Sequence, residues 1–272
     1  MRIVHLSDLH FGRHDAEIAA GLAAEVAEHA PDLVVVSGDF TQIGSAAEFS
    51  MASDFLRTLG APVFAVPGNH DLPARDLVQR FLDPYARYRR YIAEEIEPTL
   101  VRDGVALVGI NTARRLRLGL NWAEGSIGRE QLRRVAARFE AAPKHAVRVV
   151  VAHHPLLQPD VAISMKTVKR ADLALKTFAA LGVRLVLSGH FHLSYVRRHA
   201  PGEIATAVPA GPRRAACGEL LVVQAATTIS TRTRQEPNAF NVIDVGRSVS
   251  VRVREWAEGD WRTREAGVMA TA

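Results

Sequence analysis

Five short apolar segments of this chain each run directly into a group of polar residues. The segments lie at 2–7, 33–36, 62–66, 146–151 and 184–187, and their β-branched residues favour strands. Asp, Asn or His follows each of them within a few positions. In an open α/β sheet, ligands and catalytic groups gather beyond the carboxyl ends of the strands. The sequence therefore predicts strands that deliver one set of polar side chains to a common edge.

These polar groups share a chemistry of carboxylate, amide and imidazole. They are Ser7-Asp8-Leu9-His10, Ser37-Gly38-Asp39, Pro67-Gly68-Asn69-His70-Asp71, His153-His154-Pro155 and Ser188-Gly189-His190-Phe191-His192. A single Asp after a strand is usually a turn former or a helix cap, but five strands with the same endings are difficult to explain as turns. Oxygen and imidazole donors suit Zn, Mn, Fe or Co. Their number indicates a two-metal centre in which one carboxylate bridges.

Helix-like stretches separate the strands in the first part of the chain. Apolar residues recur at helical spacing over 15–30, 45–59, 73–97, 128–141 and 168–181, with Pro84 interrupting the third, and 105–110 is a further strand. After residue 194 the pattern changes to strands at 220–225, 239–245 and 248–255 without a helix signal between them. This change predicts two packed sheets with helices on the outside.

Composition excludes several classes of protein. Cys217 is the only cysteine among 272 residues, which excludes a disulfide framework and a cysteine zinc site and favours a cytoplasmic protein. The formal charge is +5, with 30 Arg scattered along the chain and four Lys, so no basic arm indicates a dedicated nucleic-acid binder. No apolar run reaches the roughly 18 residues that a membrane span needs. The first residues predict a core strand rather than a signal peptide.

The polar blocks together resemble those of a known family. Asp8-x-His10, Gly38-Asp39, Gly68-Asn69-His70-Asp71, His153 and Gly189-His190-x-His192 resemble, in order and spacing, the five blocks of the calcineurin-like metallophosphoesterases. Residues 125–132 and 224–245 also resemble segments of the bacterial branch that is similar to cyclic-nucleotide phosphodiesterases. The resemblance implies a four-layer α-β-β-α sandwich of two packed mixed β-sheets flanked by helices. One domain would span 1–272, with the metal-binding blocks at 8–192 and the C-terminal strands at about 195–257.

The resemblance also assigns roles to the polar residues. One metal ion would be held by Asp8, His10 and His192, a second by Asn69, His153 and His190, and Asp39 would bridge the two. His154 competes with His153, and we favour His153 because similar motifs use the first histidine. His70 would bind no metal and would act as proton donor or charge stabiliser above the site, oriented by Asp71 or by no acid. Asn69, His70 and His14 are the candidates for contact with substrate.

The implied activity is hydrolysis of a phosphodiester by a hydroxide that two Mn, Fe, Zn or Co ions activate. Small phosphodiesters such as 3',5'-cyclic nucleotides are the expected substrates. The alternatives are a phosphomonoesterase, a lipid-linked or nucleotide-sugar pyrophosphatase, and a catalytically idle scaffold on the same fold. Pairing of the C-terminal strands across a homodimer is a further option.

Three segments are candidates for the rim that selects the substrate, because the metal blocks do not describe it. They are 72–98, which contains several aromatic residues, 112–124 with Trp122, and 156–170 with Met165 and Lys166. Aromatic and Arg side chains together can stack a base and hold phosphate. The competing interpretation of the first segment is a helix whose aromatic residues pack on the sheet.

Overall fold

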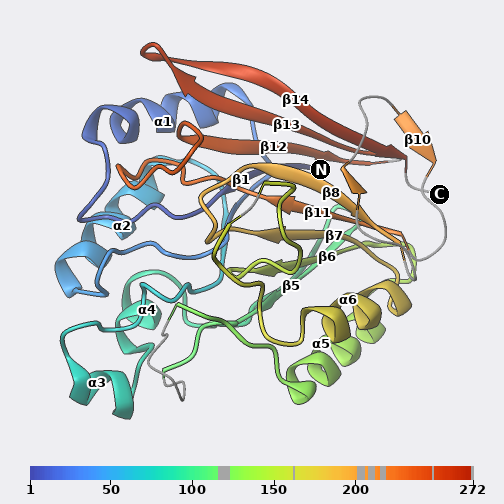
Figure 1. The fold of residues 1–272 in the computed structure, drawn as a ribbon, viewed down its shortest axis with the longest axis horizontal. Helices are drawn as coiled ribbons and strands as arrows, with labels where there is room; N and C mark the ends of the chain where they lie inside the picture. Colours follow the sequence, from blue (N-terminus) through green and yellow to red (C-terminus); the bar gives the residue numbers. More distant parts are fainter. Residues whose placement is uncertain are drawn as a thin grey trace.

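The structure is a computed structural model that describes residues 1–115, 123–161, 163–200, 206–207, 212–214, 219–246 and 248–270. Within these ranges two seven-stranded sheets pack face to face (Figure 1). The first has the order β10 (Pro212–Arg214), β14 (Asp260–Ala270), β13 (Ser248–Ala257), β12 (Ala239–Val245), β1 (Arg2–Leu6), β2 (Leu33–Val36) and β3 (Val63–Ala65). The second has the order β4 (Thr99–Arg102), β5 (Val105–Ile110), β6 (Val147–Ala152), β7 (Val183–Ser188), β11 (Leu220–Gln224), β8 (Tyr195–His199) and β9 (Thr206–Ala207).

Both sheets are mixed, as predicted. The strands β1, β2 and β3 are parallel, and β12 joins β1 antiparallel. In the second sheet β5, β6, β7 and β11 are parallel, and β4 and β8 are antiparallel to their neighbours. The parallel strands therefore point their carboxyl ends toward one end of each sheet, and these are the strands that precede most of the polar blocks.

Helices cover the outer face of each sheet (Figure 1). Their bounds are α1 Ala16–Glu28, α2 Ala46–Thr58, α3 Leu77–Leu82, α4 Ala86–Tyr91, α5 Arg129–Ala141 and α6 Ala171–Ala180. Asp15 caps α1 by accepting from two backbone N–H groups, and Ser45 and Glu48 form a capping box at the start of α2. None of the helices in the described ranges is long and apolar enough to cross a bilayer.

Three apolar clusters correspond to the three interfaces between the layers. One lies between the sheets, where Val35 of β2 and Val151 of β6 are fully buried. A second packs β1 and β2 against α1 and α2, and a third packs β5 to β7 against α5 and α6, with Phe178 at its centre. Because both faces of the central parallel strands are covered, these strands are continuously apolar. The four-layer α-β-β-α sandwich is thus confirmed.

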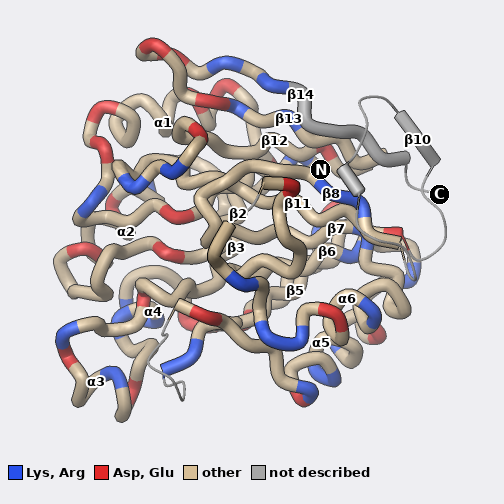
Figure 2. Tube along the Cα trace, in the orientation of Figure 1, with Lys and Arg blue, Asp and Glu red and all other residues tan. Residues whose placement is uncertain are grey.

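The structure agrees with the predicted interruption at Pro84 and extends the predicted C-terminal strands. The helical stretch over 73–97 is two six-residue helices, α3 and α4, because Asp83 and Pro84 end the first. The predicted run of C-terminal strands stops near 257, but β14 continues the antiparallel hairpin with β13 to Ala270. Acidic and basic residues are interspersed along the chain trace (Figure 2), in accord with the scattered arginines of the sequence.

Candidate metal centre

The polar groups that follow the five strands meet where the carboxyl ends of the two sheets converge. They are Asp8 after β1, Asp39 after β2, Asn69 after β3, His153 after β6 and His190 after β7, joined by His10 and His192 from the same loops. Their imidazole and carboxylate ligand atoms form overlapping groups, two of which also contain His154 or His70, and within each group all atoms lie within 4.8 Å of one another. The structure therefore brings together residues separated by as many as 184 positions, from Asp8 to His192.

The first group consists of Asp8, His10 and His192, which are all buried. Asp8 Oδ1 lies 3.1 Å from His192 Nε2 and 3.7 Å from His10 Nε2. The two Nε2 atoms are 3.2 Å apart. Two ring nitrogens and a carboxylate oxygen thus converge on one point, as the ligands of a divalent cation do.

The second group is centred on Asp39 and His153. His153 Nε2 lies 3.2 Å from Asp39 Oδ2 and 3.2 Å from Asn69 Oδ1. The same Asp39 Oδ2 is 3.7 Å from His10 Nε2, in the first group. Asp39 therefore lies between the two groups. The His190 ring packs against the His153 ring, with centroids 5.1 Å apart.

Backbone carbonyls orient the histidines of both groups. Nδ1 of His153 is 2.8 Å from the Ser37 carbonyl, and Nδ1 of His192 is 2.7 Å from the Arg232 carbonyl. Since a carbonyl only accepts, each Nδ1 carries a proton, and each Nε2 is the ring nitrogen that faces the cluster. This tautomer is the one that metal-ligating histidines adopt when their second nitrogen is hydrogen-bonded.

An unpartnered oxygen supports a cation at the first group. Asp8 Oδ2 accepts from Ser7 Oγ at 2.6 Å and from the His190 backbone N–H at 2.8 Å. Asp8 Oδ1 is buried and has no hydrogen-bond partner among the described residues. A buried carboxylate oxygen without a partner is costly, and a divalent ion would satisfy it. The nitrogen and oxygen donors therefore fit divalent metal ions.

Asp39 and the histidines of the cluster shift one another's pKa values. Burial alone would raise the pKa of Asp39, but the surrounding histidines, His153 first, hold this pKa well below its usual range. Burial alone would lower the pKa of His153, but Asp39 raises it to about 9. Asp39 thus favours a proton on His153 Nε2, and a bound cation would take the place of that proton.

Backbone strain is concentrated at the same residues. Nine residues other than glycine in the described ranges have positive φ, and five of them are candidate ligands. These five are Asp8 (φ 52°), His10 (φ 47°), Asp39 (φ 55°), His190 (φ 76°) and His192 (φ 55°). The left-handed region costs such residues on the order of 1 kcal/mol or more each. Strain of this kind typically persists at functional sites.

Close packing explains two of the glycines in the blocks. A Cβ on Gly189 would collide with the Ser7 hydroxyl and with the Asp8 carboxylate. Gly38 has φ +98°, and a Cβ there would lie 2.7 Å from His153 Nδ1. Glycine therefore lets the strand-end loops approach closely enough to place their ligands together.

Comparison with known proteins agrees with this geometry. Residues 1–194 match the family model of the calcineurin-like phosphoesterases. The chain belongs to this family. It is 26% identical over 182 residues to a probable cyclic nucleotide phosphodiesterase of Synechococcus sp., covering 66% of this chain and 65% of the relative. It is 22% identical over 218 residues to the 3',5'-cyclic adenosine monophosphate phosphodiesterase of Escherichia coli K12, covering 71% of this chain and 70% of that protein.

The fold of this calcineurin-like phosphoesterase also matches solved structures. A dimetal phosphatase from Danio rerio superposes with a TM-score of 0.67 at 12% identity, covering 98% of this chain and 99% of that one. At this identity the match shows the fold alone. The chain spans slightly less than two thirds of the length of the Synechococcus relative.

His154, the rival of His153, has both ring nitrogens engaged elsewhere. Nδ1 lies 2.7 Å from Thr112 Oγ1, and Nε2 lies 3.0 Å from the Ala123 carbonyl. Its ring packs against His190 with centroids 4.5 Å apart. His154 therefore packs against the His190 ring while its own nitrogens bond to Thr112 and Ala123, and this geometry favours His153 as the ligand.

His70 lies beside the ligand cluster, but its expected partner is different. Its Nδ1 is 2.7 Å from the Gln42 carbonyl, and its ring is edge-on to His10 with centroids 4.8 Å apart. The Asp71 carboxylate instead accepts from the backbone N–H groups of Thr41 at 3.0 Å and Gly68 at 2.8 Å. Of the two alternatives for His70, orientation by Asp71 or by no acid, the contacts favour the second, because Asp71 joins two loops and a backbone carbonyl orients the histidine.

His14 is placed away from the ligand groups. Its ring packs on Phe11, with centroids 4.7 Å apart, and it pairs with Ser230 in an isolated β-bridge. None of its contacts within the described ranges is with a candidate ligand. The structure gives no support for the suggestion that His14 touches substrate.

The rim segments divide into two kinds. Tyr85 and Tyr88 of 72–98 are buried and pack into the core beside α2, as the competing interpretation held. Met165 and Lys166 of 156–170 instead line a cavity that reaches His190. Residues 116–122, with Trp122, lie outside the described residues.

Two polar features around the site were not predicted from the sequence. Arg232 Nη1 lies 3.1 Å from His70 Nε2, although no motif marks this loop. His5, inside strand β1, is linked to Asp8 through the hydroxyls of Ser37 and Ser7, with successive distances of 2.9, 2.9 and 2.6 Å. A histidine that alternated with apolar residues in a buried strand was the only available signal for this link.

We expect His5 to make stability depend on pH. Burial lowers the pKa of His5 to about 3, below the 6.5 of an unfolded histidine. The unfolded chain therefore binds the extra proton, so stability is complete above pH 6.5 and is lost as pH falls toward 3. Between pH 7 and pH 5 this histidine should cost about 2 kcal/mol. Urea unfolding at both values should show a smaller fall for His5→Gln than for the wild type, and equal falls would contradict the assignment.

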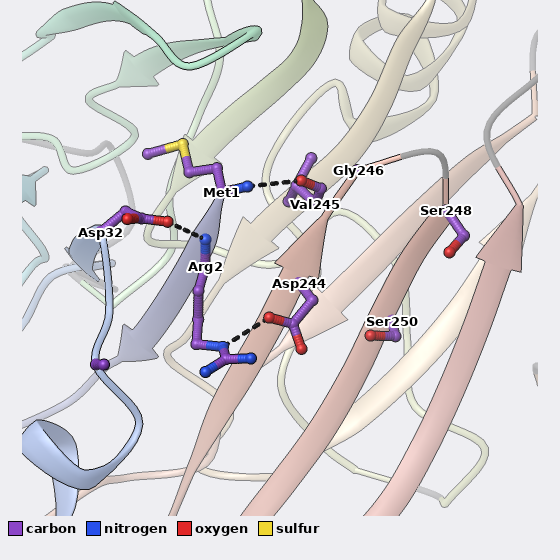
Figure 3. Close-up of a pocket in the computed structure, with 9 residues that line it drawn as sticks. Met1, Arg2, Asp32, Asp244, Val245, Gly246, Ser248 and Ser250 are labelled. Atoms are coloured by element: carbon purple, nitrogen blue, oxygen red, sulfur yellow. Dashed lines mark hydrogen bonds and ion pairs between the residues drawn. The ribbon is translucent and has the colours of Figure 1, made fainter.

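A second cavity lies at the opposite end of strand β1 (Figure 3). It has a volume of about 470 Å³ and is lined by residues that include Met1, Arg2, Asp32 and Asp244. Its polar groups pair with one another, because Arg2 Nε donates to Asp244 Oδ1 at 2.7 Å and the Arg2 backbone N–H donates to Asp32 Oδ2 at 2.6 Å. Since Arg2 begins the strand that ends before Asp8, this cavity is separate from the metal centre.

Proposed function

We propose that this phosphoesterase hydrolyses phosphodiesters at a centre of two divalent metal ions. Asp8, His10 and His192 would hold one ion, Asn69, His153 and His190 would hold the other, and Asp39 would bridge them. The observation that carries the proposal is the position of Asp39 Oδ2, 3.2 Å from His153 Nε2 and 3.7 Å from His10 Nε2. Mn, Fe, Zn and Co all accept this donor set.

Metal ions held there would supply Lewis acidity and lower the pKa of water, which are the requirements for attack on phosphorus. The residues of the chain set the geometry for that chemistry. His70, oriented by the Gln42 carbonyl, is our candidate to donate a proton to the departing oxygen or to stabilise its charge. Arg232 Nη1 donates to its Nε2 in this arrangement, so a proton-donor role requires that this contact opens and Nε2 is protonated. Asp71 acts as a positioning residue, because it joins the loop after β2 to the loop after β3 through Thr41 and Gly68.

The names of two relatives support the substrate class. The two relatives described above carry the names of cyclic nucleotide phosphodiesterases, so small phosphodiesters, including 3',5'-cyclic nucleotides, are the substrates that we propose. A cytoplasmic location stays a proposal that rests on the single cysteine, and Cys217 itself lies outside the described residues. A homodimer through the C-terminal strands stays a prediction.

Metal analysis combined with two chromogenic substrates tests the proposed function. We expect purified protein to contain close to two metal ions per chain and to hydrolyse bis(p-nitrophenyl) phosphate faster than p-nitrophenyl phosphate. Removal of the ions with a chelator should abolish turnover, and Mn²⁺ should restore it. Turnover of the monoester alone would favour the phosphomonoesterase, and absence of both metal and turnover would favour the scaffold.

A further inference from the structure

The loop between β11 and β12 presents two arginines to the metal centre. Arg232 and Arg234 lie in this loop, about 40 positions after the last ligand in the sequence, His192. The Arg232 carbonyl orients His192 through Nδ1 at 2.7 Å. The backbone of the loop is thus fixed against the ligand cluster, and its side chains lie within reach of whatever binds there.

The Arg232 guanidinium is held beside His70. Nη1 lies 3.1 Å from His70 Nε2 and 3.3 Å from Gln42 Oε1. Among the described residues these are the side-chain hydrogen bonds of Arg232, and both use Nη1. Nε and Nη2 are therefore available to donate to a ligand, in the fork geometry that matches two oxygens of a phosphate.

The positive charge of Arg232 also lacks an acidic partner in the described part of the chain. Other arginines of the C-terminal strands are paired, for example Arg254 with Glu25 at 2.7 Å and Arg264 with Glu255 at 2.9 Å. Arg232 contacts only a neutral amide and an imidazole. The half-buried Arg232 guanidinium has no carboxylate partner among the described residues, and the His70 side chain lies between it and His10. It is therefore suited to an anionic substrate.

Arg234 lines a cavity that reaches His190. The cavity has a volume of about 370 Å³ and is bounded by Ala123, Glu124, Ser164, Met165, Lys166, His190 and Arg234. Lys166 Nζ lies 3.8 Å from Glu124 Oε1, so these two charges offset each other. With these two charges offset, Arg234 gives the cavity a net positive charge. Met165 adds an apolar wall to a space of the size that a small organic group requires.

The two arginines approach the cluster at different histidines. His70, which contacts Arg232, packs on His10, whereas His190, at the Arg234 cavity, packs on His153. If the departing oxygen faces His70, the attacking oxygen lies opposite it, and the retained ester group lies to the side of that line. The cavity beside His190 offers space there for the retained group.

We propose that Arg232 binds the oxygens of the reacting phosphoryl group and that the Arg234 cavity receives the retained ester group of the diester. The proposal rests on the proposed function and specifies its substrates. Phosphodiesters whose retained group is neutral or anionic are accepted, and those whose retained group is cationic are disfavoured by the charge of Arg234.

The test for Arg232 compares Arg232→Gln and Arg232→Lys with the wild type. The matched control is Arg262→Gln, whose side chain pairs with Glu258 at 2.6 Å in the β13–β14 hairpin. Loss of hydrogen bonds to a charged phosphoryl group should lower kcat/KM for bis(p-nitrophenyl) phosphate about 10- to 100-fold in Arg232→Gln. Arg232→Lys should lose less, because it keeps the charge but not the fork. Arg262→Gln should match the wild type.

Two further measurements separate substrate binding from a structural role. Inhibition by inorganic phosphate should weaken about as much as kcat/KM falls in Arg232→Gln. Metal content should stay at the wild-type value, because the substitution keeps the backbone carbonyl that orients His192. Unchanged phosphate inhibition, or loss of metal in Arg232→Gln, would overturn the assignment of Arg232.

The test for Arg234 uses a charge reversal. Bis(p-nitrophenyl) phosphate retains a neutral ester group when p-nitrophenolate departs, and p-nitrophenyl phosphorylcholine retains a cationic one. Arg234→Glu should raise kcat/KM for the choline ester relative to the bis ester by about 10-fold or more, because one unfavourable charge contact becomes favourable. An unchanged ratio would overturn the cavity assignment. If the wild type turned over neither substrate, the proposed function itself would fail, which is a distinct result.

Discussion

Asp39→Asn is expected to reduce turnover of bis(p-nitrophenyl) phosphate by about 10³-fold or more. Asp39 Oδ2 lies between His10 Nε2 and His153 Nε2, so an amide nitrogen there would remove the one negative charge shared by both ligand groups. Asn keeps Oδ1 as the acceptor for the His70 backbone N–H, which lies at 2.8 Å. The loss should therefore come from metal binding and not from collapse of the loop.

Metal analysis of the same variant identifies the cause. We expect Asp39→Asn to hold at most one ion per chain while its unfolding transition stays cooperative. A variant that kept both ions and near wild-type turnover would show that Asp39 does not bridge. Addition of excess Mn²⁺ should recover only part of the activity, because the bridging oxygen is missing at any metal concentration.

His70→Ala is expected to keep the metal ions but to slow turnover by about 10²- to 10⁴-fold, the range for loss of a general acid. The side chain hydrogen-bonds to Gln42 and Arg232 and packs on the His10 ring, and a ring nitrogen lies within 4.8 Å of a carboxylate oxygen of Asp39 without a hydrogen bond to it among the described contacts. Its backbone N–H to Asp39 survives in alanine. The loss should therefore appear in kcat, with metal content at the wild-type value.

The matched control is His14→Ala, which removes the same side chain from a position beside Phe11. This variant should retain wild-type metal content and turnover. Complete metal loss in His70→Ala would make His70 a ligand and contradict its role, and an equal loss of activity in both variants would point to general destabilisation.

The ligand cluster was predictable from sequence because its geometry is encoded locally. Each block follows a buried apolar strand directly, and a parallel sheet brings the ends of such strands together. Gly38 and Gly189 mark the places where loops approach too closely for a Cβ. The chemistry of Asp, Asn and His then restricts the possible ligand to a divalent metal.

The partner of His70 was not predictable, since it is a backbone carbonyl. The sequence indicated Asp71 or no acid as the group that orients His70, whereas in the structure the carbonyl of Gln42 orients it. Every residue except the last has such an acceptor, so sequence gives no signal for which one is used. Arg232 was missed for a related reason, because its loop has neither periodicity nor a motif and approaches His70 only through the tertiary fold.

The interruption over 73–97 was predictable from Pro84. Aromatic and apolar residues recur there at helical spacing, but Asp83 and Pro84 stop the first helix, so two six-residue helices form. Tertiary packing of Tyr85 and Tyr88 then decides the conformation. Strand β4, with three exposed residues out of four, was missed because edge strands lack the apolar pattern of a core strand.

Crystals grown with Mn²⁺ provide the most direct test of the two-metal centre. An anomalous difference map should show two peaks, one bounded by Asp8, His10 and His192 and one bounded by Asn69, His153 and His190, with the Asp39 carboxylate between them. A map without density at Asp39, or with manganese bound only elsewhere on the molecule, would contradict the account of how this phosphoesterase works.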